Sequence, residues 1–229
     1  HMTRTTMARQ AGLLYLPTVI LAPFTLIYIP GALFVRGDAT ATANNIAAHE
    51  TLFRVGIVTD LFSAVLWILI ILALYRLLRE VDQTCAVVMA TLGGVMVTLI
   101  NFLITLNNLA ALILVRGADF LSVFEKPQRD ALAMLFLRIH AQGILAAELF
   151  WGLWLFPLAI LVYRSRFLPR FLGVWLVLNG LAYLAMSFTG LLLPQYAEMV
   201  GKLTVPALFG ELALMLWLVI RGAEERSRI

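Results

Sequence analysis

This chain has little cysteine and little charge. Cys85 is the one cysteine among 229 residues, so a disulfide, a CxxC motif and a thiol relay within the chain are excluded. Charged residues make up 13% of the sequence, whereas a soluble domain averages about 25%. Hydrophobic residues make up 62%, and the mean hydropathy is +0.94. The composition therefore predicts an all-α protein, a polytopic bundle of transmembrane helices.

The motifs of several chemistries are missing as well. The sequence has no GxSxG, no HExxH and no Walker motif, which disfavours the usual serine and zinc intramembrane hydrolases and a stand-alone ATPase. No basic stretch is long enough to bind nucleic acid, and no lysine lies in a predicted span, which disfavours a retinal Schiff base. His1 and Met2 resemble a cloning remnant, so the native histidines are His49 and His140, too few for a three-histidine zinc site.

Long apolar runs predict six spans. Each is about long enough to cross a hydrocarbon core of about 30 Å. They lie near residues 11–35, 55–78, 85–115, 142–163, 171–193 and 204–221. Ten Lys and Arg residues fall on one side and seven on the other, which favours cytoplasmic N- and C-termini in a bacterial inner membrane. The first apolar run is too long for a cleavable signal. We expect one integral membrane domain over residues 1–229.

Two segments on the predicted outer side have the patterns of helices, so they are expected to be more than linkers. Residues 40–53 have the spacing of a short interfacial helix. Residues 128–141 are amphipathic and continue into the fourth span. Pro127 precedes this segment, and Asp130 is expected in its first turn, where a negative charge suits the helix dipole. The resulting helix is expected to exceed 35 residues.

The most informative residues are three acids inside the predicted spans, Asp60, Glu148 and Glu211. A carboxylate in hydrocarbon costs about 2.5–3.5 kcal/mol on insertion scales, so such residues usually have a use. All three are expected in the outer half of the bilayer, around an outward-opening polar pocket. They are candidate proton donors or acceptors. The alternative is structural: pairing with Arg54 or Arg138, or a protonated carboxyl bridging helices.

The second and fourth spans share a local pattern. Asp60-Leu61-Phe62 is followed fifteen residues after the acid by Tyr75-Arg76, and Glu148-Leu149-Phe150 by Tyr163-Arg164 at the same spacing. The sixth span matches more loosely. One interpretation is a pseudo-repeat of three helical hairpins, from spans two and three, four and five, and six and one. The other is chance similarity between leucine-rich helices.

Polar residues lie along one face of several spans. In the third span this stripe is expected to serve helix packing or to place Asn101 and Asn108 in the pocket. Asn179, Tyr183 and Ser187 share a face of the fifth span. Aromatic residues are expected to line an apolar or cation-stabilising wall, namely Trp67, Phe150, Trp151 and Trp154. We therefore expect ligand contacts from Asn101, Asn108, Trp151, Trp154, Asn179 and Tyr183.

His140 and two arginines flank these faces. His140 is either an interfacial residue, a proton partner of Glu148 or a metal ligand. A metal site would combine His49, His140, Asp60 and Glu148, although no local ligand motif supports it. We expect no cofactor. Arg54 and Arg138 either anchor the helices at the interface or bind an anionic headgroup.

Five stretches carry a family resemblance. They are ARQAGLLYL at 8–16, LFRVGIVTDL at 52–61, LYRLLREV at 74–81, FLRIHAQG at 136–143 and LVYRSRFLPRFLGVWLVLNGLAYL at 161–184. Together they resemble the "domain of unknown function 4386" family of bacterial six-helix membrane proteins. The resemblance places at motif positions Arg54, Asp60, His140, Tyr163, Arg164, Pro169 and Gly173. Many members carry a histidine where this chain has Trp154, so a histidine-based mechanism lacks that residue here. The family implies location and topology, and no activity.

The hypothesis that joins these features is a polar intramembrane site that binds a lipid or isoprenoid-like amphipathic molecule, with acid–base catalysis by the acids. A proton-coupled small-molecule transporter or channel is the first alternative, and a non-catalytic scaffold or sensor is the second. The expected partners are membrane lipids, a hydrophobic or amphipathic small molecule and a second copy of the chain in a homodimer.

Overall fold

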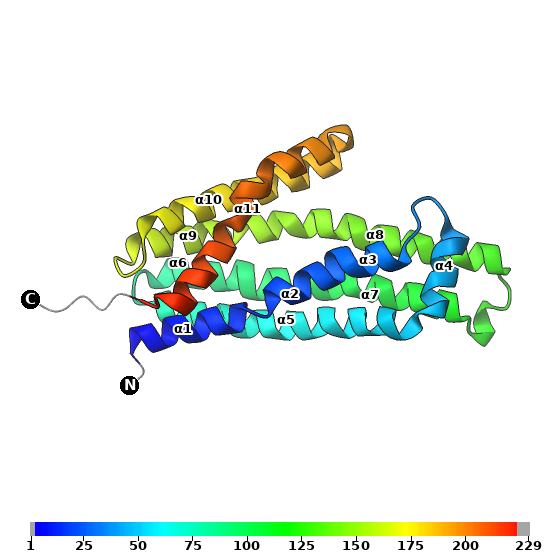
Figure 1. Cartoon of the computed structure of the whole chain (residues 1–229), viewed down its shortest axis with the longest axis horizontal. Helices are drawn as coiled ribbons and strands as arrows, with labels where there is room; N and C mark the ends of the chain where they lie inside the picture. Colours follow the sequence, from blue (N-terminus) through cyan, green and yellow to red (C-terminus); the bar gives the residue numbers. More distant parts are fainter. Residues whose placement is uncertain (1–2, 224–229) are drawn as a thin grey trace, which may run out of the picture. The chain divides into compact units, whose positions relative to one another are not determined.

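The computed structural model describes residues 3–223, and every regular element in that range is a helix (Figure 1). Six helical segments are long and apolar enough to cross a membrane, which confirms the predicted transmembrane helical architecture. In chain order they are Arg4–Leu33, Glu50–Leu78, Gln83–Arg116, Lys126–Arg164, Arg170–Leu192 and Pro194–Ile220.

Several of these segments consist of more than one helix. The first contains α1 (Arg4–Tyr15), α2 (Thr18–Pro23), a π-helix (Phe24–Tyr28) and α3 (Ile29–Leu33). The third contains α6 (Gln83–Met89), a π-helix (Ala90–Met96) and α7 (Val97–Arg116). The second segment is α5 (Glu50–Leu78), and the fourth contains α8 (Lys126–Leu153) and α9 (Leu155–Arg164). The fifth is α10 (Arg170–Leu192), and the sixth contains α11 (Ala197–Ile220). Outside this series, α4 (Ala39–Ala48) precedes α5, and short 3₁₀ turns cover Asp119–Leu121 and Pro194–Tyr196.

Proline accounts for two of the interruptions. Pro17 follows the end of α1, and Pro157 lies in the first turn of α9. Proline has no N–H to donate, and its ring collides with the carbonyl four residues earlier, which for Pro157 belongs to Leu153. The helix accordingly divides at Trp154. The segment Lys126–Arg164 has the predicted length, at 39 residues, but it is two helices where a single one was expected.

The described chain forms two compact units, which we treat separately. Within the described residues, the first contains residues 3–17, 65–99 and 145–223, and the second contains residues 18–64 and 100–144. This division reflects packing within the chain, so it does not test the prediction of a single membrane domain.

Glycines allow the helices of the first unit to approach closely. A Cβ on Gly152 of α8 would lie 2.7 Å from the carbonyl oxygen of Gly180 on α10. A Cβ on Gly210 of α11 would lie 2.9 Å from the carbonyl oxygen of Trp175, also on α10. Gly12 places α1 equally close to Val219 of α11. Small residues at such crossings are typical of membrane helices, which gain little from burying apolar surface against one another.

The contacts of the first unit include two pairings that the repeat predicts. In that unit α9 packs on α10, and α1 packs on α11. These correspond to the hairpins of spans four and five and of spans six and one. Adjacent spans also pack together without any repeat, so the pseudo-repeat stays a prediction.

A tight hairpin joins α9 to α10. The hydroxyl of Ser165 donates to the carbonyl oxygen of Val162 at 2.8 Å and accepts from the N–H of Leu168 at 3.2 Å. Arg166 between them has φ 60°, a left-handed conformation that costs a non-glycine residue about 1 kcal/mol or more. Arg164 reaches Asp82 at 3.2 Å, and Arg170 lies over the Tyr163 ring. The turn is therefore held by its own side chains.

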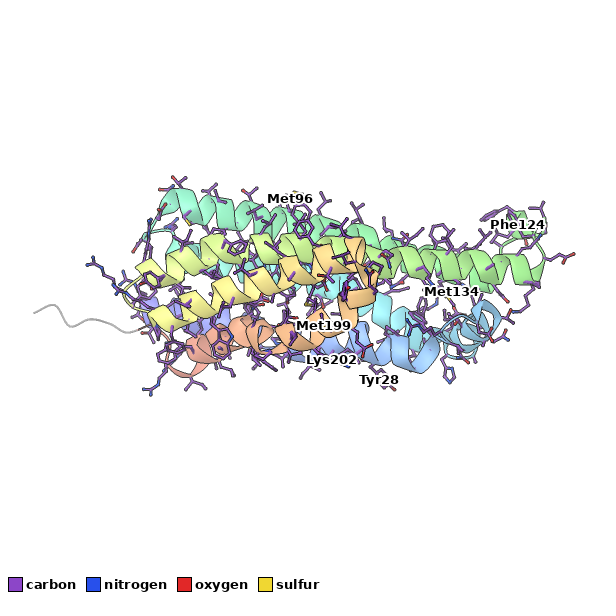
Figure 2. All side chains as sticks on the ribbon, turned by 90° about the horizontal axis from the view of Figure 1, so that it is seen from above. Tyr28, Met96, Phe124, Met134, Met199 and Lys202 are labelled. Atoms are coloured by element: carbon purple, nitrogen blue, oxygen red, sulfur yellow. The ribbon has the colours of Figure 1, made fainter. Side chains whose placement is uncertain are left out.

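The second unit has an apolar core that α3, α4, α5, α7 and α8 share. Phe53, Ile46 and Leu33 are its most deeply buried large side chains. Many large apolar side chains elsewhere in the described chain are exposed. Figure 2 shows how densely carbon covers the helices, with exposed examples labelled at Tyr28, Phe124 and Met199. Outward apolar surfaces of this kind fit contact with lipid.

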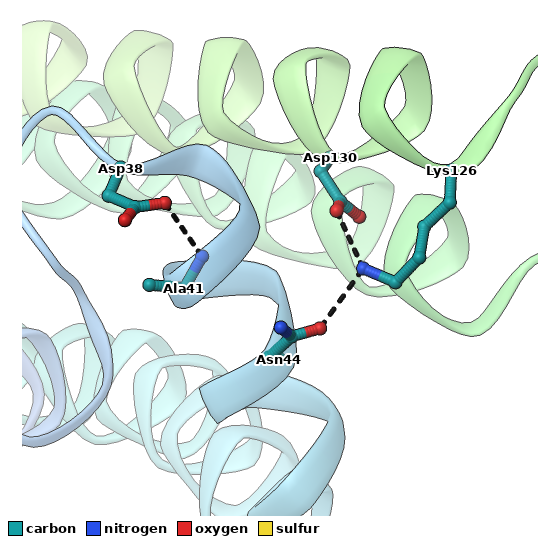
Figure 3. Close-up of polar contacts among 5 residues, drawn as sticks. All are labelled: Asp38, Ala41, Asn44, Lys126 and Asp130. Carbon is teal, nitrogen blue, oxygen red and sulfur yellow. Dashed lines mark hydrogen bonds and ion pairs between the residues drawn. The ribbon is translucent and has the colours of Figure 1, made fainter.

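The helix α4 begins and docks through polar contacts (Figure 3). Asp38 caps it by accepting the N–H of Ala41 at 2.8 Å. Lys126 donates to Asn44 of α4 at 3.0 Å and to Asp130 at 2.6 Å. A helix is thus present where an interfacial helix was predicted, but it ends at Ala48, and its position at the interface stays a prediction. Asp130 was expected in the first turn of its helix, but α8 begins at Lys126 and has no acid in that turn, so Asp130 instead pairs with Lys126.

Replacing Lys126 with methionine should lower the free energy of unfolding by about 1–2 kcal/mol, because the Asp130 carboxylate, 4% exposed, loses its cation. Lys202→Met is the matched control. Lys202 and Glu198 form a pair of the same spacing and the same 2.6 Å length, but both side chains are largely exposed, so that change should be nearly neutral. Thermal unfolding in detergent gives both values. Equal effects of the two substitutions would contradict this account.

Candidate functional site

The Glu211 carboxyl lies at the centre of a hydrogen-bonded group in the first unit. The hydroxyl of Tyr15, from α1, donates to its Oε1 at 2.5 Å, and the hydroxyl of Tyr183, from α10, donates to its Oε2 at 3.2 Å. The side chain of Asn179, one turn before Tyr183, makes a third hydrogen bond with it. Two helices, α1 and α10, therefore direct polar groups at a carboxyl on a third, α11, and hydrogen bonds of this kind reduce the cost of burying a polar group.

Asn179 also ties this group to the backbone. It is fully buried, and its Nδ2 lies 3.5 Å from the carbonyl oxygen of Leu208. In the same part of α11, the carbonyl oxygen of Pro206 accepts the indole N–H of Trp175 at 3.0 Å. Ser187, the third residue of the predicted face, donates to the carbonyl oxygen of Leu145 at 2.6 Å. Thus the polar face of α10 is used for helix contacts along most of its length.

Aromatic rings pack against the two tyrosines that bond to this carboxyl. Tyr15 packs edge-on against Trp67, with ring centroids 5.6 Å apart, and Trp67 packs edge-on against Trp154 at 5.3 Å. Trp151 packs edge-on against Tyr183 at 5.8 Å. Such edge-to-face pairs contribute about 0.5–1.5 kcal/mol each beyond their buried area. Trp67, Trp151 and Trp154 thus all contact aromatic neighbours, while their role in lining a ligand site stays a prediction.

The π-helix of the third span positions one of these rings. The wider winding of a π-helix removes the regular bonding of an α-helix and leaves carbonyls for other donors. The indole N–H of Trp67 donates to the carbonyl oxygen of Gly93 at 2.9 Å. Gly93 is also where Trp154 packs: a Cβ there would lie 2.9 Å from its ring. The irregular turn therefore accommodates both tryptophans.

Glu148 differs from Glu211 in having few partners. Its side chain is only 6% exposed, and the structure gives its Oε2 no hydrogen-bond partner. It interacts electrostatically with Tyr183, the tyrosine that donates to Glu211, and Trp151 follows it by one turn on α8. The described ion pairs include neither carboxyl. A buried carboxyl oxygen without a partner is costly and calls for an explanation.

Asp60 lies in the second unit, with partners of its own. It hydrogen-bonds with the hydroxyl of Thr25, which follows Pro23 and lies in the first π-helix. It also interacts electrostatically with His140, whose Nδ1 lies 2.9 Å from the carbonyl oxygen of Ile104. His140 therefore contacts the backbone of α7 and interacts with the carboxyl group of Asp60 on α5. Its predicted role beside Glu148 stays a prediction.

The predicted arginines and asparagines of the second unit have separate surroundings. Arg54 pairs with Glu50 at 2.7 Å, and Arg116 approaches the same carboxylate at 3.6 Å. Arg138 is exposed. Asn101 accepts the hydroxyl of Thr105 on its backbone oxygen at 2.8 Å, and Asn108 is buried with its Oδ1 unpartnered. The stripe of the third span is interrupted, because the π-helix at Ala90–Met96 changes the turn angle before Asn101.

The candidate metal residues do not form a ligand group in the described part of the chain. In residues 3–223, no three His, Cys, Asp or Glu side chains come together as a metal site would require. His49 interacts with its own helix, through Nδ1 and the carbonyl oxygen of Asn45 at 3.1 Å.

Two residues of these sites were missed from the sequence. Tyr15 and Thr25 both lie in the first span, which offered no acid to draw attention to them. The available signal was proline, since Pro17 follows Tyr15 by two residues and Pro23 precedes Thr25 by two. Proline interrupts a helix, and interrupted helices in membranes occur where backbone or side chains line a polar site.

Comparison with known proteins places the chain in a family. The model of "Domain of unknown function (DUF4386)" matches residues 10–222, which confirms the resemblance seen in the sequence. An uncharacterized protein of Archaeoglobus fulgidus is 35% identical over 77 residues, which are 32% of this chain and 43% of that protein. The chain thus matches less than half the length of this relative. No solved structure matches the chain significantly.

Proposed function

We propose, from the premise that this chain belongs to the DUF4386 family, that it is a multi-pass membrane protein which binds an amphipathic small molecule at Glu148. The observation that supports the site is the Glu148 carboxyl, 6% exposed and with Oε2 lacking a hydrogen-bond partner. In hydrocarbon such a group is costly, and a ligand that pairs with it removes the cost. Trp151 and Tyr183, whose rings pack edge-on, supply an apolar wall for the body of the ligand.

Glu211 has a different role in this proposal. Because Tyr15, Tyr183 and Asn179 already satisfy its oxygens, Glu211 fixes the position of Tyr183. Tyr183 then meets the ligand on the side of Glu148. Acid–base chemistry on a bound lipid or isoprenoid-like molecule would use Glu148, since a carboxyl with a free oxygen is available to give or take a proton. Asp60 and His140 form a second titratable group that the proposal leaves outside this site.

The expected result is a molecule that co-purifies with the protein and depends on Glu148. Native mass spectrometry with lipid extraction, on protein in mild detergent, should find it in the wild type and lose it in Glu148→Gln. Glu198→Gln, which changes an exposed acid of the same unit, is the control and should retain it. Asp60→Asn tests the other unit and should also retain it. A co-purifying molecule that survives Glu148→Gln would contradict the proposal.

The second candidate function is proton-coupled transport. The interruptions of the first, third and fourth spans favour it, since transporters place their sites at broken helices. The same comparison separates the two functions. No retained molecule, together with an unchanged melting temperature in Glu148→Gln and Asp60→Asn, would favour transport. No retained molecule with a large loss of stability would mean that the acids mainly hold the helices together.

We also propose the bacterial inner membrane, with both termini in the cytoplasm. The support is the bias of ten basic residues against seven between the two sides of the predicted spans. A green fluorescent protein fused after the C-terminus should fluoresce in cells, because it folds in the cytoplasm. Alkaline phosphatase fused at the same place should stay inactive. The opposite pair of results would reverse the orientation.

A further inference from the structure

Neither Glu148 nor Glu211 of the first unit takes part in a described ion pair. On α11 the nearest basic residues to Glu211 are Lys202, nine residues before it, and Arg221, ten residues after it. At 1.5 Å per residue these are about 13–15 Å away along the axis. From Glu148 onward, no Lys, Arg or His occurs before Arg164. The described ion pairs of Lys202 and Arg164 are with Glu198 and Asp82.

Glu211 and Glu148 differ in their hydrogen bonds. Glu211 receives donors at both oxygens, so its carboxyl is satisfied by hydrogen bonds without a cation. The unpartnered Oε2 of Glu148 lacks even a dipole. A buried carboxylate is usually paired with a cation or coordinates a metal. Neither a cation nor a metal-ligand group accompanies Glu148 in the described residues.

The neighbouring rings are suited to a positive charge. Tryptophan and tyrosine faces attract ammonium groups through the ring quadrupole, at about 0.5–2 kcal/mol according to how dry the site is. The rings of Trp151 and Tyr183 pack edge-on against each other. Trp151 lies one turn after Glu148 on α8, and Tyr183 interacts electrostatically with Glu148. A neutral hydroxyl would satisfy the unpartnered oxygen, but it would not offset a negative charge on the carboxyl or interact with the ring quadrupoles. An anionic headgroup would be repelled by both carboxyls.

We infer that the ligand is an amphipathic organic cation, with a substituted ammonium group against Glu148 and the rings of Trp151 and Tyr183, and an apolar body in the bilayer. This inference rests on the proposed function and adds the charge of the ligand to it. The ammonium group supplies the partner that Glu148 lacks. The rings select a substituted ammonium over a strongly hydrated one, because methyl groups on nitrogen contact ring faces well.

The test uses three small probes of matched shape on the full chain in lipid nanodiscs. They are 4-phenylbutyl-trimethylammonium, its neutral carbon isostere with a tert-butyl end, and a phenylalkyl carboxylate. Affinities come from calorimetry, with tryptophan fluorescence as a second reading. The wild type should bind the cation at least tenfold more tightly than the neutral isostere and should not bind the carboxylate. In Glu148→Gln this ratio should fall to about one, while Glu198→Gln should keep it.

The other outcomes would overturn this inference, and they differ in what they mean for the proposed function. Equal affinity of the wild type for cation and isostere would overturn the charge of the ligand and leave the site itself standing. No binding of any probe, with a co-purifying molecule still lost in Glu148→Gln, would have the same meaning. No probe binding and no such molecule would overturn both. If Glu148→Gln does not fold, the ratio in the wild type still decides.

Discussion

Replacing Glu211 with alanine is expected to lower the free energy of unfolding by about 2–4 kcal/mol. The substitution leaves the hydroxyls of Tyr15 and Tyr183 without their acceptor, and each buried donor that loses its partner costs about 1–3 kcal/mol. It also removes a link between α1, α10 and α11, which come from opposite ends of the sequence. Chemical or thermal unfolding in detergent, followed by tryptophan fluorescence, measures the change.

Conservative variants separate the hydrogen bonds from the packing. Glu211→Gln keeps one acceptor oxygen and nearly the same volume, so its effect should be about half as large or less. Tyr15→Phe removes one donor and keeps the ring against Trp67. If the group acts as a unit, Tyr15→Phe combined with Glu211→Gln should cost less than the sum of the two single changes. Glu198→Ala on the same helix is exposed and should change little. A Glu211→Ala protein as stable as the wild type would refute the role of this group.

The spans were predictable because their signal is local and strong. A run of about twenty apolar residues has few other uses, and each backbone group in hydrocarbon must find its partner within a helix. The helix α4 was predicted almost as well, from the spacing of residues 40–53, and Pro127 marks the start of α8 by its own chemistry. The end of α4 at Ala48 was missed, since the sequence HETLF continues the helical pattern without a break.

The interruptions of the spans were harder to predict. Pro157 explains the division at Trp154, yet Pro206 lies inside α11, which continues past it. Both prolines lack the N–H that a helix uses, so the residue type alone does not predict which of them ends a helix. The π-helix at Ala90–Met96 follows no proline at all. Within it, the carbonyl oxygen of Gly93 accepts the indole N–H of Trp67, and the missing side chain leaves room for the ring of Trp154. Such features depend on contacts between distant segments, which a local pattern does not contain.

The site was predicted in its parts and not in its connections. The cost of burying charge identified Glu148 and Glu211, and helical spacing identified Tyr183 and Asn179. Spacing within a helix says which residues share a face, but not which helix that face meets. Tyr15 therefore remained unnoticed, although it makes the shortest bond to Glu211. No local pattern separates Glu211, whose oxygens are satisfied, from Glu148, whose Oε2 is not.

Enlarging Gly152 is expected to lower the free energy of unfolding, because this residue lies where α8 crosses α10. Even the Cβ of alanine would lie 2.7 Å from the carbonyl oxygen of Gly180 and 3.2 Å from the Cβ of Tyr183. The nearest atom belongs to the backbone, so no side chain can turn away, and α8 and α10 must separate. Overpacking typically costs about 1–3 kcal/mol, so we expect about that loss for Gly152→Ala and more for Gly152→Val. Thermal unfolding in detergent gives both values.

The same change tests whether packing and binding depend on one contact. Tyr183 lies three residues after Gly180, and Trp151 directly precedes Gly152, so separating α8 from α10 should part the two rings that face the proposed ligand. Gly152→Ala should therefore also lose the co-purifying molecule. Gly201→Ala is the control, since a Cβ there meets nothing within 4 Å, and alanine favours a helix by about 1 kcal/mol. A Gly152→Ala protein as stable as the wild type would show that this crossing is looser than the structure describes. If it also kept its ligand, the site would not depend on the approach of α8 to α10.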